Sequence, residues 1–187
     1  MTPDEVTLAV IDALELAGLR YLIVGSLSSN FHGVPRATQD ADFVVDVAAG
    51  DISRLAEALP ATLVLESQAG FETVTGSLRY VIAAAGNPFI CELFVHSDDP
   101  HDVERMRRRL RVSIIGRQTF VATAEDAIVT KLRWAALARR GKDVEDVRNI
   151  IAVRGDELDW GYVRQWTAAH GSITLLEEIR QSIPPER

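Results

Sequence analysis

The chain has 187 residues, with 20 Lys and Arg against 27 Asp and Glu, so its formal net charge at pH 7 is −7. At about 150 residues per domain, this length favours one domain or one domain with a small addition. A hydrophobic content of 47% excludes general disorder, and no apolar run reaches the roughly 18 residues of a membrane span. The single cysteine, Cys91, excludes an internal disulfide and favours a cytoplasmic location.

The first two thirds of the chain alternate helical and strand patterns. Thr2, Pro3 and Glu5 predict a capped helix that ends near Gly18, and Asp51 begins a second helix of about 51–59. A short helix is expected between the first strand and residue 40. A charged helix is expected to end near Arg109. The predicted strands are 21–24, 40–47, 61–66, 71–75, 78–84, 89–95 and a hairpin of 111–115 and 118–121 through Gly116-Arg117.

From Thr123 onward the strand patterns disappear. Thr123 and Asp126 form a capping box, and Gly141 separates that helix from the next. Three further helices are expected at about 143–153, 159–169 and 172–182, before a frayed tail. The predicted fold class is therefore mixed α/β (α+β), with a central mixed sheet flanked by helices over 1–122 and a C-terminal helical region over 123–187 packed on it.

Gly25 and Ser26 follow the first strand and precede a helix. The N–H groups and the positive end of that helix favour an anion there. Gly25 permits a close approach, and Ser26 either caps the helix or binds phosphate. A Gly-Ser pair after a strand is by itself usually only a turn, so the phosphate interpretation depends on acidic residues further along the chain.

Two carboxylates lie two residues apart on the second predicted strand. Asp40 and Asp42 therefore point to one face, and Ala41, Phe43 and Val45 point to the other. Adjacent carboxylates repel each other unless a cation compensates. Clusters of oxygen ligands suit magnesium, particularly where substrate phosphates complete the coordination. The alternative is a solvated strand end.

Glu92 is the only charged residue in the apolar strand of 89–95. A buried, unpaired charge is costly. If this strand lies beside 40–47, Glu92 completes a three-carboxylate metal site with Asp40 and Asp42. Two metals in such a site hold a triphosphate, activate an acceptor hydroxyl and stabilise the leaving pyrophosphate. The alternative is a rim or salt-bridge residue.

These motifs resemble those of the nucleotidyltransferase superfamily that includes DNA polymerase beta. Val24-Gly25-Ser26, a gap of 13 residues and Asp40-Ala41-Asp42 match its signature. Residues 33–42, GVPRATQDAD, look more narrowly like the R-x-T-x-D-hydrophobic-D form of bacterial nucleotidyltransferases related to the AbiE toxins of abortive-infection systems. Lys131-Leu132 and residues 139–146 are similar to the helical K-L and R-x-K-D-x-x-D motifs of that group.

The resemblance implies a nucleotidyltransferase core that uses Mg²⁺ or Mn²⁺ to transfer a nucleoside monophosphate from a nucleoside triphosphate (NTP) to an acceptor. It implies that Asp40 and Asp42 bind the metals, and that Glu92 is the third ligand and the base for the acceptor hydroxyl. Lys131 then reaches the triphosphate and is oriented by two acids. The implied nucleotide-binding residues are Gly25, Ser26, Arg36, Thr38, Lys131, Asp143 and Asp146.

Without the resemblance, the helical motif has a plainer interpretation. Lys131 is then a surface lysine whose stem covers apolar neighbours, and Asp143 and Asp146 are an acidic first turn that suits the helix dipole. Arg36 either binds phosphate or clamps an acidic neighbour. The arginine-rich residues 104–111 either contact nucleic-acid phosphates or form a solvated helix face.

The expected partners are an NTP and an acceptor that is RNA, protein or a small molecule, with no membrane. The AbiE-type resemblance adds a toxin function and an antitoxin partner. The alternative is a catalytically inactive nucleotide-binding or partner-binding protein with the same fold.

Overall fold

The computed structural model describes residues 1–48, 50–66, 68–72, 76–138 and 140–183. The chain forms two compact units, one of Met1–Val24 with Ala37–Ala122 and one of Gly25–Arg36 with Thr123–Arg187. One division between the two units falls between Ala122 and Thr123. Gly25–Arg36, which the sequence pattern placed in the first domain, groups instead with the C-terminal helices. Among the described residues, no helix combines the length and the apolarity that crossing a bilayer requires.

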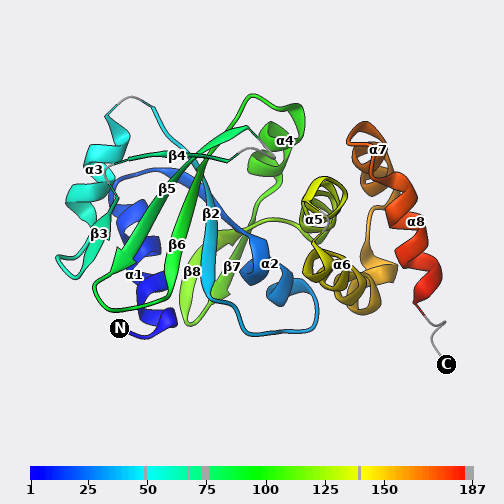
Figure 1. The fold of residues 1–187 in the computed structure, drawn as a ribbon, viewed down its shortest axis with the longest axis horizontal. Coiled ribbons are helices and arrows are strands. Elements are labelled where there is room, and N and C mark those ends of the chain that lie inside the picture. The colour runs from blue at the N-terminus through cyan, green and yellow to red at the C-terminus, as the bar shows by residue number, and fades with distance from the viewer. Residues whose placement is uncertain (49, 67, 73–75, 139, 184–187) are drawn as a thin grey trace. The chain divides into compact units, whose positions relative to one another are not determined.

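An eight-stranded mixed sheet forms the first unit (Figure 1). Its order is β3-β5-β6-β2-β1-β8-β7, and β4 pairs with β5 off this path. The strands are β1 (Arg20–Val24), β2 (Asp40–Asp46), β3 (Leu63–Leu65), β4 (Gly70–Glu72), β5 (Ser77–Ala84), β6 (Ile90–Val95), β7 (Leu110–Ile114) and β8 (Arg117–Val121). Because β2 is antiparallel to β1 and parallel to β6, the predicted mixed sheet is confirmed.

The helices of this unit are α1 (Pro3–Leu16), α3 (Asp51–Ala58) and α4 (Pro100–Arg108). The predicted capping box of α1 is confirmed, because Glu5 N donates to Thr2 Oγ1 at 3.2 Å and Thr2 N donates to Glu5 Oε2 at 2.7 Å. Reciprocal bonds of this kind satisfy N–H groups that a helix start otherwise leaves unpaired. The helix therefore begins where the sequence pattern predicts.

The two faces of the central strands differ. One face of β2 and β6 carries fully buried apolar side chains, among them Phe43, Val45 and Leu93. On the opposite face, Val44 packs in a cluster with Met106 of α4. Asp40 and Asp42 lie on the same face of β2 as Val44, nearer the start of the strand.

Cys91 precedes Glu92 on β6, so its side chain points to the opposite face of the sheet, which is buried and apolar. Its burial, together with the charges of Asp42 and Asp40, raises the pKa of the Cys91 thiol to about 12. The thiol therefore stays protonated at neutral pH and serves as a small apolar side chain there.

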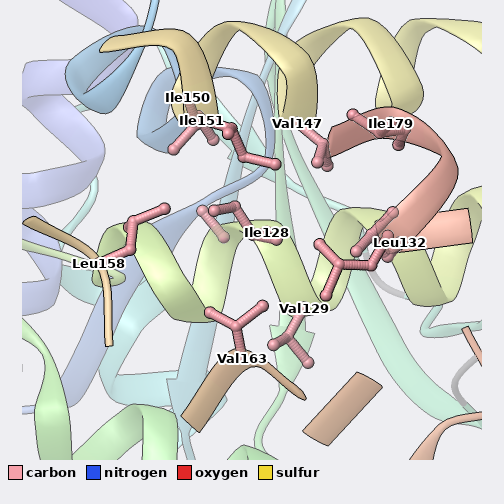
Figure 2. Close-up of a cluster of buried hydrophobic side chains, with 11 residues drawn as sticks. Ile128, Val129, Leu132, Val147, Ile150, Ile151, Leu158, Val163 and Ile179 are labelled. Carbon is pink, nitrogen blue, oxygen red and sulfur yellow. The ribbon is translucent and has the colours of Figure 1, made fainter. Parts of the chain in front are cut away.

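The second unit contains α2 (Gly25–His32), α5 (Ala124–Ala138), α6 (Gly141–Arg154), α7 (Trp160–Ala169) and α8 (Ile173–Ser182), with a 3₁₀ turn at Gly155–Glu157. Figure 2 shows its apolar core, in which side chains from α5 and α6 point toward one another and meet side chains of the later helices. Its fully buried members are Ile128, Val129, Leu132, Val147, Ile150, Val163 and Leu176. This core accounts for the helical periodicity after Thr123.

Gly33 ends α2 at a place where its chain approaches α6 closely. A Cβ at this position would lie 3.0 Å from the backbone N of Ile150 and 3.1 Å from the carbonyl carbon of Asn149. Contacts this short are tighter than nine in ten real Cβ contacts, so the backbone of α6 would have to shift by a few tenths of an ångström to admit a side chain. Glycine therefore permits the close packing of α2 against α6.

Two expected elements differ in detail from the structure. The turn between β7 and β8 is formed by Ile115 and Gly116, both with positive φ, of 51° and 74°, so Arg117 belongs to β8 and not to the turn. A pair of positive-φ residues joins strands with the correct twist. The strand expected at 71–75 is described only as Gly70–Glu72, because 73–75 lie outside the described residues, as do Pro184 to Arg187.

Candidate active site

Three carboxylates gather on one face of the sheet in the first unit. Asp40 and Asp42 flank buried Ala41 on β2, and Glu92 lies on β6 with Asp42 as its Cα partner. One carboxylate oxygen from each residue lies within 4.8 Å of the other two. The two strands are therefore neighbours, which is the condition for a three-carboxylate site, and their pairing brings Asp40, Asp42 and Glu92 together.

These carboxylates fit a divalent cation. Carboxylate oxygens are the ligands that Mg²⁺ prefers, and two oxygens on one Mg²⁺ are separated by at most about 4.2 Å, twice the usual metal–oxygen distance. The oxygens of Asp40, Asp42 and Glu92 lie within 4.8 Å of one another, so small side-chain rotations bring them to that separation. All three side chains are partly exposed, which leaves room for a substrate to supply further ligands.

Thr38 fixes the orientation of Asp40. Its Oγ1 donates to Asp40 Oδ1 at 2.7 Å, and it also lies 3.1 Å from the backbone oxygen of the same residue. A hydrogen bond to a carboxylate stabilises the charged form and restricts its rotation. Thr38, which the resemblance assigns to nucleotide binding, therefore contacts Asp40, a candidate metal ligand.

Arg79 on β5 makes an ion pair with Glu92, with 2.6 Å between Arg79 Nη1 and Glu92 Oε1. Glu92 therefore takes part in a salt bridge, as the alternative interpretation of this residue expected. Arg79 was not predicted from the sequence as a site residue. Its one signal was a cation in an otherwise apolar strand, the same kind of signal that singled out Glu92.

In the second unit, Lys131 of α5 is buried between two carboxylates of α6. Its Nζ lies 2.9 Å from Asp143 Oδ1 and 2.8 Å from Asp146 Oδ2. Lys131 is 7% exposed, Asp143 1% and Asp146 3%. The interpretation of Lys131 as a surface lysine is therefore wrong, whereas Asp143 does lie in the first turn of α6 as the alternative had it. Burying these charges is costly unless they are paired, and here they pair with one another.

Arg36 joins this network and extends it to α2. Its guanidinium holds Asp146 with two bonds, Nε to Oδ1 at 2.7 Å and Nη2 to Oδ2 at 2.9 Å. Nη2 also donates to Ser26 Oγ at 2.9 Å. Asn30 fixes the backbone of Arg36 from both sides, with contacts of 2.7 and 3.0 Å. Arg36 therefore clamps an acidic neighbour and contacts the predicted phosphate-binding serine.

Asp146 shows the electrostatic balance of this network. Burial raises the pKa of its carboxyl, but the hydrogen bonds from Arg36 and Lys131 and their charges outweigh burial and leave the pKa below its ordinary value. Asp146 is therefore ionised at neutral pH. Arg140 adds a further contact, with its Nε 3.3 Å from Asp143 Oδ2, while Arg139 lies outside the described residues.

The arginine-rich helix α4 is partly neutralised by its own acids. Arg105 pairs with Asp102 at 2.8 Å, and Arg107 pairs with Glu104 at 2.7 Å. Arg107 is exposed and agrees with the interpretation as a solvated helix face, whereas Arg105 and Asp102 are buried and do not.

The chain is similar in structure to known nucleotidyltransferases. It matches the solution structure of the antibiotic-resistance factor ANT(2'')-Ia with a TM-score of 0.63 at 15% identity, over 97% of this chain and 99% of that one. It matches a crystal structure of ANT(2'')-Ia in complex with adenylyl-2''-tobramycin with a TM-score of 0.59 at 17% identity, over 90% and 98%.

A third match is an antigenic nucleotidyltransferase-like protein from Paracoccidioides brasiliensis, with a TM-score of 0.54 at 18% identity, over 96% of this chain and 94% of that one. No protein-family model and no curated protein matches the chain. The chain therefore has the nucleotidyltransferase fold, as the sequence motifs predicted.

Proposed function

We propose that this protein is a metal-dependent nucleotidyltransferase that transfers a nucleoside monophosphate from an NTP to an acceptor hydroxyl and releases pyrophosphate. The observation that carries the proposal is the cluster of Asp40, Asp42 and Glu92, with ligand atoms within 4.8 Å of one another, in a chain with the nucleotidyltransferase fold. A structural acidic cluster on its own would not favour this function. The fold and the cluster together favour it.

In this proposal Asp40, Asp42 and Glu92 hold Mg²⁺ or Mn²⁺, which supplies Lewis-acid stabilisation of the charge that develops on the phosphates. Glu92 also accepts the proton of the acceptor hydroxyl. The acceptor oxygen forms a bond to the α-phosphorus as the bond from phosphorus to the pyrophosphate oxygen breaks. Thr38 keeps Asp40 oriented throughout.

We also propose that residues of the second unit contact phosphate. Ser26 Oγ accepts a hydrogen bond from Arg36, so its own hydrogen is left to donate to a phosphate oxygen. An ammonium group has three donors, and Asp143 and Asp146 take two of those of Lys131. The third donor is the one we assign to the triphosphate. Gly25, with φ 59°, begins α2 and presents its N–H at the helix start.

The acceptor is proposed to be a small molecule, an RNA or a protein. The complex of ANT(2'')-Ia with adenylyl-2''-tobramycin supports testing small molecules that carry hydroxyl groups. The R-x-T-x-D pattern of Arg36, Thr38 and Asp40 supports the AbiE-type toxin function, which predicts an antitoxin partner. The inactive-protein alternative predicts binding without transfer.

The test is transfer from each of the four α-³²P-labelled NTPs with Mg²⁺, using an aminoglycoside mixture, total RNA and a mixed protein fraction as acceptors. We expect label in one acceptor class, its loss in Asp42→Asn and its retention in Asp46→Asn. Asp46 is the matched control because it lies on the same strand but is 45% exposed and pairs only loosely, at 3.8 Å, with Arg20. Absence of transfer to every acceptor would support the inactive alternative.

A further inference from the structure

Arg79 brings a positive charge into contact with the carboxylate cluster. β5 is antiparallel to β6, with Arg79 opposite Phe94 and Val81 opposite Glu92. Arg79 and Glu92 are therefore diagonal neighbours on one face of the sheet, within reach of a long side chain. The 2.6 Å contact between Arg79 Nη1 and Glu92 Oε1 is the result.

The strand on the other side of Arg79 leaves room for the guanidinium. Gly70 of β4 is the Cα partner of Arg79. A Cβ at Gly70 would lie 3.7 Å from both Nε and Nη2 of Arg79, so the guanidinium extends across the glycine. The Arg79 side chain is 39% exposed and the Glu92 side chain 16%. The pair is therefore half-buried at the rim of the cluster and open to exchange with an incoming ligand.

We propose that Arg79 is the resident counter-ion of the carboxylate cluster: it holds Glu92 when no cation is bound and competes with a divalent cation for that carboxylate. The inference rests on the proposed function, because it takes Asp40, Asp42 and Glu92 as the metal ligands. A cation that binds Glu92 must displace the guanidinium or approach it closely, and either event weakens binding. Arg79 thus lowers the affinity of the cluster for free metal.

This arrangement favours a cation that arrives with its nucleotide. The triphosphate brings its own oxygen ligands and negative charge, which offset the repulsion from Arg79. A free cation lacks this compensation. Arg79 is therefore a positioning residue that makes metal binding depend on nucleotide.

The experiment measures Mn²⁺ binding without nucleotide, by electron paramagnetic resonance of the free ion, in the full chain. We expect Arg79→Gln to bind Mn²⁺ about tenfold more tightly than the unchanged protein, a modest effect because solvent screens a partly exposed charge. Arg79→Lys, which keeps the charge, stays within about twofold. Arg117→Gln is the matched control, since Arg117 also pairs with a carboxylate, that of Asp12, at 2.9 Å.

Glu92→Gln separates competition for Glu92 from general repulsion. If Arg79 acts through Glu92, the effect of Arg79→Gln falls to within about twofold in the Glu92→Gln background. An undiminished effect there, or equal Mn²⁺ affinity of Arg79→Gln and the unchanged protein, overturns the inference. Thermal unfolding of each variant checks that it is folded, and Arg79→Met, which also removes the charge and should also bind Mn²⁺ about tenfold more tightly, takes the place of Arg79→Gln if that variant is not folded.

Failure of the proposed function gives a different result. In that case the unchanged protein either binds no Mn²⁺ or binds it no more tightly than Asp42→Asn does. Either result overturns both the proposed metal site and the inference about Arg79. Mn²⁺ binding that depends on Asp42 but is indifferent to Arg79 leaves the proposed function standing and overturns the counter-ion alone.

Discussion

Lys131 is buried together with the two carboxylates that neutralise it. Its Nζ lies within 2.9 Å of oxygens on Asp143 and Asp146, and Arg36 holds Asp146 from the other side. Loss of one member destabilises such a network, because the charges that remain buried lose one of their partners. The same network extends to Ser26 through Arg36, so it links the stability of the helical unit to the proposed phosphate contact.

We therefore expect Lys131→Met to lower the free energy of unfolding by about 3–5 kcal/mol, since it leaves a buried pair of carboxylates without its ammonium partner. Urea unfolding followed by circular dichroism measures this. Lys142→Met is the matched control, because Lys142 is exposed on α6, and its effect should stay within about 0.5 kcal/mol. Equal effects of the two substitutions would show that the Lys131 network contributes nothing to stability.

The acid stability of the protein is expected to depend on Asp146. Its folded-state pKa lies below the ordinary value of 3.8, so its contribution is fully present above that value and is lost as the pH falls through the folded-state pKa. The free energy of unfolding should therefore decrease as the pH is lowered below about 4. Urea titrations between pH 7 and pH 2.5 should show a shallower decrease in Asp146→Asn, and identical slopes would contradict the role of this carboxyl.

At the scale of elements, the join between α2 and α6 is set by Gly33. A Cβ there would lie 3.0 to 3.3 Å from backbone atoms of Asn149 and Ile150, and backbone cannot rotate away as a side chain can. The motif residues Arg36 and Ser26 flank this join in sequence. The position of α2 on α6 therefore determines whether Arg36 reaches Asp146.

Gly33→Ala should destabilise the protein by about 1–3 kcal/mol, because the added methyl group forces α2 and α6 apart. Gly141→Ala is the matched control: nothing lies within 4 Å of a Cβ at this first residue of α6. That change should be neutral or stabilising by up to about 1 kcal/mol. Thermal unfolding compares the two, and a Gly33→Ala protein as stable as Gly141→Ala would rule out the close approach.

The carboxylate cluster could be predicted because it depends on a short-range rule. Residues two apart on a strand share a face, so Asp40 and Asp42 had to point together. Joining Glu92 to them needed one further condition, the pairing of β2 with β6, which the structure confirms. Arg79 needed a second pairing, β5 with β6, and nothing in the local pattern specifies that order.

The buried charges of the helical unit could not be predicted from pattern, because helical periodicity assigns charged residues to the solvent side. Only the family resemblance placed Lys131, Asp143 and Asp146 in one group. The segment Gly25–Arg36 was also misplaced, because its position in the sequence lies between two strands while its contacts are with α5 and α6. Tertiary contacts outweighed sequence order in both cases.

On the scale of the whole molecule, the central claim is that Asp40, Asp42 and Glu92 bind a metal–nucleotide complex in a chain with the nucleotidyltransferase fold. Substitution of one carboxylate by its amide keeps size and shape while removing a charge that a divalent cation requires. Asp42→Asn should therefore remain folded and lose binding of the complex. Asp46→Asn should keep it, because Asp46 lies at the exposed end of the same strand.

The most direct measurement is calorimetric titration of the protein with each of the four NTPs, with and without Mg²⁺. The account predicts binding of at least one NTP that requires Mg²⁺, is lost in Asp42→Asn and is retained in Asp46→Asn. Binding that is indifferent to Mg²⁺ or to Asp42, or no binding of any of the four, would contradict it.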